Sequence, residues 1–165
     1  MNRRDFLLGT ATTALAGVSG LANAEPALAK PRRSVRLAHL TDIHVQPERG
    51  APEGMELCLK HVHNLKDRPQ LILTGGDLVM DCLGADKERT TLQWDVFQSV
   101  LKNNCDLPVE HCLGNHDVWG WNIPAQTKNE ALFGKKFAMD RLELTRPYRS
   151  FDRFGWHFII LDSTH

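Results

Sequence analysis

The sequence predicts an α/β fold in which helices cover a parallel sheet, and two features of the 165-residue chain support this prediction. Three short runs, each apolar or alternating and each bounded by Pro, Gly or Asp, are typical of strands. Two longer segments with apolar residues at helical spacing separate these runs. A chain that alternates strand and helix in this way makes right-handed crossovers, so the strands should be parallel and their carboxyl ends should share one edge of the sheet.

The elements follow one another from residue 35 onward. In chain order we predict strand 35–41, helix 53–66, strand 70–74, helix 86–103 and strand 107–113. Pro52 is placed to start the first helix. The apolar faces expected on the two helices comprise Met55, Leu57, Leu59, Val62 and Leu65, and then Leu92, Val96, Val100 and Leu101.

A polar cluster follows each predicted strand, at the edge where open α/β sheets place their chemistry. The clusters are Asp42-Ile43-His44, Gly75-Gly76-Asp77 and Gly114-Asn115-His116-Asp117. Asp42 and His44 are two residues apart, so they point to the same side of the pleat and can reach one cation. The glycines before Asp77 permit a tight turn, which lets its carboxylate extend into the site and bridge two ions.

The third cluster supplies further groups of the same kind. Asn115 offers a neutral carbonyl oxygen, and His116 offers an imidazole that can donate a proton or a hydrogen bond to an oxyanion. Asp117 is placed to orient that imidazole. Two metal ions roughly 3.5–4 Å apart would hold a phosphate and generate hydroxide from bound water at neutral pH.

Taken in order, the three clusters resemble the first three signature blocks of the calcineurin-like metallophosphoesterases, Asp-x-His, Gly-Asp and Gly-Asn-His-Asp. The resemblance implies that Asp42 and His44 bind a first metal ion. Asp77 would bridge two divalent ions, Asn115 would bind the second, and His116 would assist departure of the leaving group. The ions would be manganese, iron or zinc. The implied activity is hydrolysis of a small-molecule phosphomonoester or phosphodiester by metal-bound hydroxide.

The resemblance extends from about Val35 to the end of the chain. Residues 148–164 are similar to the hairpin that the family carries after its third block. Met80 stands where the purple acid phosphatase branch has a metal-bound tyrosine, which disfavours that branch.

The resemblance also implies ligands that this sequence does not contain. In the family a further His and a Gly-His-x-His block complete the two coordination spheres, and neither occurs before His165. We therefore expect the chain to be the amino-terminal part of a longer enzyme and to be catalytically incompetent by itself. The implied fold is a partial four-layer αββα sandwich with the first sheet and its helices present and the second half missing. Strands 71–73 and 158–161 are apolar on both faces, so we expect an uncovered apolar surface.

The amino terminus resembles a twin-arginine export signal. Asn2-Arg3-Arg4-Asp5-Phe6-Leu7 is followed by a moderately apolar run and by the small-x-small site Ala22-Asn23-Ala24. A second such site, Ala27-Leu28-Ala29, leaves the position of the cut open. A short uncleaved anchor is the alternative, although residues 7–22 are short for a membrane span.

These features divide the chain into three parts. We predict a signal peptide at 1–24, a solvated linker at 25–34 and a truncated phosphoesterase domain at 35–165. The expected partner at the amino terminus is the twin-arginine export machinery, and no stable membrane anchor is expected. The expected location is the periplasm or the exterior of a bacterium.

Composition narrows the choice of partners. Twenty basic and twenty acidic residues give a net charge of zero, so nothing suggests nucleic acid or an anionic membrane surface as a partner. We predict Cys58 and Cys112 to be buried free thiols. Cys82 and Cys105 lie in or near loops, where a bridge such as Cys105 to Cys112 is the less favoured alternative.

Four further residues have two interpretations each. His39 and His111 lie inside predicted strands, where packed core histidines are commoner than ligands. Trp119 and Trp121 follow the third cluster, and they either stack on a base or sugar of the substrate or are buried against the hairpin.

Two classes of function fit the sequence. The first is the dinuclear-metal phosphoesterase described above. The second is a non-catalytic exported protein that keeps part of the fold and binds only metal or a partner. A reading frame that continues into a Gly-His-x-His block would favour the enzyme, and one that ends at His165 would favour the second class.

Overall fold

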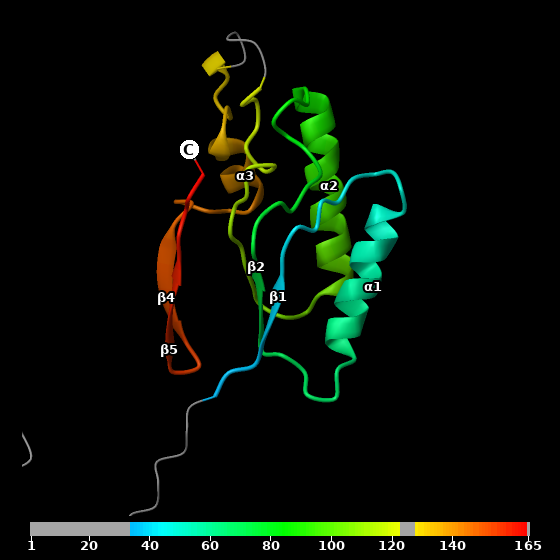
Figure 1. Ribbon diagram of the computed structural model, residues 1–165, viewed down its shortest axis with the longest axis vertical. Coiled ribbons are helices and arrows are strands. Elements are labelled where there is room, and N and C mark those ends of the chain that lie inside the picture. Colours follow the sequence, from blue (N-terminus) through cyan, green and yellow to red (C-terminus); the bar gives the residue numbers. More distant parts are fainter. Residues whose placement is uncertain (1–33, 123–127, 165) are drawn as a thin grey trace, which may run out of the picture. The chain divides into compact units, whose positions relative to one another are not determined.

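The computed structural model describes residues 34–122 and 128–164, so the predicted signal peptide and the predicted linker up to residue 33 lie outside the described residues. The elements are β1 Leu37–Leu40, α1 Ala51–His63, β2 Leu71–Thr74, α2 Lys87–Asn104, β3 Val109–Glu110, α3 Lys135–Arg141, β4 Arg149–Arg153 and β5 Trp156–Ile160. In Figure 1, α1 and α2 lie together on one side of β1 and β2, and the β4–β5 hairpin lies on the other side. Within the described ranges no helix is long and apolar enough to cross a membrane.

The strands β1, β2 and β3 form a parallel sheet, as the sequence predicted, and β2 lies in the middle of it. Leu37 to Leu40 pairs in register with Leu71 to Thr74, so the loops after β1 and β2 leave the sheet at the same edge. The ladder of β3 covers only two residues and is shorter than the predicted strand. Beyond it the Cys112 N–H still donates to the Thr74 carbonyl (3.2 Å), which keeps the chain beside β2 as far as the third cluster.

Both predicted helices are present, and α2 begins and ends within one residue of its predicted bounds. The Asp86 side chain accepts a hydrogen bond from the Arg89 N–H (2.7 Å), which caps the first turn of α2. The first helix begins two residues earlier than predicted, after Gly50 in the left-handed conformation (φ 66°), and it has Pro52 in its first turn. It ends at His63, three residues before the predicted end.

The hydrophobic core lies between the two helices and the sheet, and it contains part of the predicted apolar face of α1. Met55, Leu59 and Val62 are buried as expected. Leu57 is 67% exposed and Leu65, beyond the end of the helix, is also exposed, so both predictions are wrong. Residues two apart on an α-helix point about 200° apart, so Leu57 cannot share the buried face of Leu59.

The face that α2 presents to the core is aromatic. Trp94 and Phe97 are fully buried, with their rings edge to face at 5.8 Å, whereas the predicted core residue Leu92 is exposed. The other predicted residues, Val96, Val100 and Leu101, are partly buried against the core as expected, so the prediction is wrong at Leu92 and lacks the aromatic members of the face.

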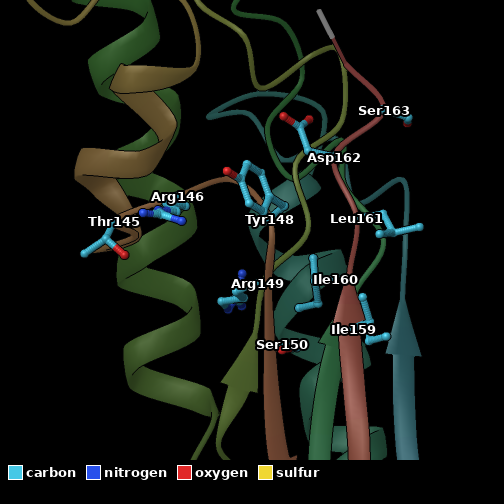
Figure 2. A pocket seen from close by; sticks show the side chains of 10 residues that line it. All are labelled: Thr145, Arg146, Tyr148, Arg149, Ser150, Ile159, Ile160, Leu161, Asp162 and Ser163. Atoms are coloured by element: carbon cyan, nitrogen blue, oxygen red, sulfur yellow. The ribbon is translucent and has the colours of Figure 1, made fainter.

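The hairpin expected from the resemblance is present as antiparallel β4 and β5. An ion pair between Arg149 Nη2 and Glu110 Oε2 (2.8 Å) joins it to β3. Its outer face is apolar and uncovered, with Ile159 65% and Leu161 73% exposed, as the sequence led us to expect. A hollow of about 740 Å³ adjoins this face. Tyr148 and Ile160 are among its lining residues (Figure 2), and none of the candidate metal ligands lines it.

The histidine and cysteine predictions are confirmed only in part. His111 is buried, but His39 is exposed because β1 is an edge strand and His39 lies on the face away from the helices. Cys58 is exposed on α1, and Cys112 is only half-buried. All four cysteines, each within the described part of the chain, are free thiols, so the alternative of a Cys105 to Cys112 bridge is not realised.

Candidate metal centre

Backbone hydrogen bonds hold the loops after β1 and β2 side by side. The Asp42 N–H donates to the Gly76 carbonyl (3.2 Å). The His44 N–H donates to the Asp77 carbonyl (2.9 Å). These bonds continue the pairing of β1 with β2 past the strand ends, so the first two polar clusters are aligned as the parallel sheet predicted.

Three of the predicted ligands come together at this edge. Asp42, His44 and Asp77 each present a ligand atom, and these atoms lie within 4.8 Å of one another. His44 Nε2 is 3.7 Å from Asp77 Oδ2 and 3.9 Å from Asp42 Oδ1. These distances are too long for hydrogen bonds, and they leave room for a cation between the donor atoms.

The backbone is strained at the same three residues. Asp42, His44 and Asp77 have φ values of 54°, 47° and 51°, in the left-handed region that residues other than glycine seldom adopt. Strain of this kind persists only where the surrounding structure imposes it, and it concentrates at functional sites. Arg49, Glu143 and Phe154 have similar φ values outside this group, so it is the convergence of the three ligand atoms that favours a functional role over simple packing.

Two glycines bring the third cluster into contact with this group. A Cβ on Gly114 would lie 2.1 Å from Asp77 Oδ1 and 2.4 Å from the Asp77 nitrogen. A Cβ on Gly76, whose φ is 96°, would lie 2.5 Å from the Gly114 nitrogen. Neither position has room for a side chain, so the close approach of the second and third clusters depends on glycine at both.

In both Asp42 and Asp77, one carboxylate oxygen accepts a hydrogen bond from the protein and the other oxygen faces His44. Asp77 Oδ1 accepts a hydrogen bond from the His116 N–H (3.0 Å), which leaves Oδ2 on the side of His44. Thr41 Oγ1 donates to Asp42 Oδ2 (2.6 Å), which leaves Oδ1 facing the same imidazole. The free oxygens and His44 Nε2 form a set of three donors for one cation.

His116 lies next to this donor set. Its ring centroid is 4.7 Å from that of His44, and the two rings are nearly perpendicular. His116 Nδ1 lies 2.6 Å from the carbonyl oxygen of Met80. Because a carbonyl oxygen only accepts, Nδ1 carries the hydrogen, and Nε2 is the nitrogen left to interact with a ligand.

Asp117 does not orient this imidazole, and that prediction is wrong. The carboxylate is fully buried and points into the protein, where Oδ1 accepts from the Leu78 N–H (2.8 Å) and Oδ2 accepts from the Gly114 N–H (2.8 Å). Burial raises the pKa of Asp117 to about 6 even though these hydrogen bonds favour the charged form. The residue ties the loop after β2 to the loop after β3.

Asn115 and the two tryptophans that follow the third cluster have different surroundings. Asn115 is exposed, and its backbone carbonyl accepts from the Val118 N–H (3.2 Å), so its role as a ligand stays a prediction. Trp119 is buried against Phe137 of α3, and its indole N–H donates to the Ala85 carbonyl (3.1 Å), which rules out stacking on a substrate. Trp121 is 44% exposed, so both interpretations of it stay open.

Two polar groups of the site were missed in the sequence. The carbonyl of Met80 acts through the backbone, which carries no sequence signal. The role of the Thr41 hydroxyl could have been predicted from the sequence, because a hydroxyl directly before a predicted carboxylate ligand is well placed to donate a hydrogen bond to it.

Two carboxylates and an imidazole are donors that fit manganese, iron or zinc, so the residues present suit a divalent metal ion. A family model described as calcineurin-like phosphoesterase matches residues 35–161, which include all three polar clusters. No curated protein gives a significant match to the chain. The family match covers most of the chain and agrees with the fold and with the converging ligands. The chain therefore belongs to the calcineurin-like phosphoesterase family.

Proposed function

We propose that the chain carries the metal site of a phosphoesterase that uses two divalent ions to hydrolyse a small phosphomonoester or phosphodiester. The observation behind the proposal is the convergence of Asp42, His44 and Asp77, each with a strained backbone, where β1 and β2 end. We assign Asp42 and His44 to the first ion, Asp77 to both ions and Asn115 to the second. The absence of any net charge favours a small substrate over nucleic acid.

Bound ions would supply polarisation of the phosphoryl oxygens and a lowered pKa for water. The chain positions the acid that assists the leaving group. His116 holds its Nδ1 hydrogen against the Met80 carbonyl, so Nε2 is the nitrogen that meets the substrate. In the charged imidazolium form Nε2 donates a proton to the departing oxygen, which matters most when that oxygen is a poor leaving group.

The activity is tested on the full-length protein with manganese. The assay follows p-nitrophenol release from p-nitrophenyl phosphate and from bis(p-nitrophenyl) phosphate, which separates monoesterase from diesterase activity. Asp77→Asn keeps the acceptor for the His116 N–H but removes the charge, so we expect kcat to fall about 100-fold. Asp140→Asn, at an exposed acid of α3, should leave kcat unchanged. Equal rates for the parent and Asp77→Asn would refute the proposed metal site.

We also propose that the chain is exported by the twin-arginine route to the periplasm or the exterior of a bacterium. The support is the Arg3-Arg4 pair, followed by an apolar run and a small-x-small site. Replacing Arg3 and Arg4 by Lys should retain the protein in the cytoplasm, whereas the same change at Arg32 and Arg33 should not. Cell fractionation measures the difference. Export of the first variant at the parental level would contradict the proposal.

A further inference from the structure

A buried glutamine of α2 holds the loop that carries the hydrogen-bond partner of His116. Gln93 is 1% exposed, and its side-chain amide pairs in both directions with the backbone of Asp81. Gln93 Oε1 accepts from the Asp81 N–H (3.0 Å), and Gln93 Nε2 donates to the Asp81 carbonyl (2.9 Å). An amide buried in an apolar core is unfavourable unless it is paired, so these two bonds account for its place there.

The bond to Gln93 and the bond to His116 meet at one peptide group. The Asp81 N–H and the Met80 carbonyl belong to the same planar unit, so this peptide donates to Gln93 Oε1 and accepts from His116 Nδ1. If the peptide plane turned, both bonds would break together. Bonds in such a chain also polarise one another, which strengthens the acceptor that His116 meets.

Backbone hydrogen bonds fix the loop on both sides of this peptide but do not involve the peptide itself. The Met80 N–H donates to the Val45 carbonyl (3.0 Å), and the Cys82 N–H donates to the His116 carbonyl (2.9 Å). These two bonds hold the loop on either side of the peptide between residues 80 and 81. Besides His116, the side chain of Gln93 bonds to that peptide itself.

We propose that Gln93 is a positioning residue for His116. It fixes the peptide between Met80 and Asp81, and that peptide fixes which nitrogen of the imidazole carries the hydrogen and which one meets the substrate. The inference builds on the proposed role of His116 in leaving-group departure. The position of the His116 hydrogen can also be tested in the protein without metal or substrate, separately from the activity.

The first experiment observes His116 directly by NMR in metal-free, 15N-labelled full-length protein. We expect an Nδ1–H tautomer with a slowly exchanging imidazole proton, identified by its loss in His116→Gln. In Gln93→Met that signal should be lost to exchange. In Gln98→Met it should remain, because Gln98 is a second amide of α2 that bonds instead to the Arg141 carbonyl (2.6 Å).

Two results of this experiment would overturn the inference. One is an Nε2–H tautomer in the parent protein, which decides the question even if Gln93→Met fails to fold. The other is a folded Gln93→Met variant with an unchanged His116 signal.

The second experiment compares leaving groups with manganese-loaded protein. Gln93→Met should lower kcat about tenfold for phenyl phosphate and less than threefold for p-nitrophenyl phosphate, since only the poorer leaving group needs a well-placed acid. A general loss of structure or of metal would lower both rates equally, and that result would contradict a positioning role. If the parent hydrolyses neither ester, the proposed function fails, while the NMR experiment still decides the position of His116.

Discussion

Replacing Gly114 by alanine should displace the candidate ligand Asp77. The added Cβ would lie 2.4 Å from the Asp77 backbone nitrogen, whereas ordinary contacts of this kind begin at 3.4 Å. The loop that carries Asp77 and the loop that carries Gly114 would therefore have to move apart by about 1 Å. A steric overlap of this extent with the backbone costs about 3 kcal/mol of folding free energy. A ligand displaced by about that distance should bind a divalent ion about 100-fold more weakly.

Urea denaturation of the metal-free protein measures the stability, and titration calorimetry with manganese measures the affinity. Gly54→Ala is the matched control, because Gly54 lies in α1 and a Cβ there would meet nothing within 4 Å. The control should gain about 0.5–1 kcal/mol from helix propensity and keep its metal affinity. A Gly114→Ala protein with parental stability and affinity would refute the close packing of the second and third clusters.

Two further predictions concern buried titratable groups. Burial and the nearby Arg149 cation lower the pKa of His111 from 6.5 to about 4. The unfolded chain then binds a proton more readily than the folded one, so stability rises with pH between about 4 and 6.5, by about 3 kcal/mol. Urea midpoints at both ends of that window should show a smaller pH dependence in His111→Gln, and an unchanged dependence would contradict the assignment. Asp117→Asn places an amide N–H against the Gly114 N–H and should destabilise the protein by about 3 kcal/mol in the same assay, unlike exposed Asp152→Asn. Equal stability of the two variants would show that Asp117 does not tie the loops.

The sequence predicted the sheet and the convergence at its edge because both follow from local pattern. A chain that alternates strand and helix forms parallel strands. The carboxyl ends of parallel strands share one edge of the sheet, so Asp42 and Asp77 come to the same edge whatever the rest of the fold does. Which residues reach the core is decided by packing between elements, so the aromatic face of α2 around Trp94 was missed. The exposure of His39 was missed for the same reason, since only the assembled sheet shows that β1 is an edge strand.

The partners of the third cluster were harder to predict than the cluster itself. Asp117 and His116 are neighbours in sequence, which suggested contact, but consecutive side chains in this turn point in different directions. The acceptor for His116 is a backbone carbonyl, a group that every residue carries. Its identity therefore depends on how the loop between β2 and α2 folds, and that loop is held by a glutamine twelve residues further along the chain.

The most direct test of the metal centre is a calorimetric titration of metal-free protein with manganese or zinc. The parent and the Asp140→Asn control should bind the ion equally. His44→Ala and Asp77→Asn should each weaken binding by about tenfold or more, because each removes one of three converging donors. Parental affinity in both His44→Ala and Asp77→Asn would show that these side chains do not hold the metal.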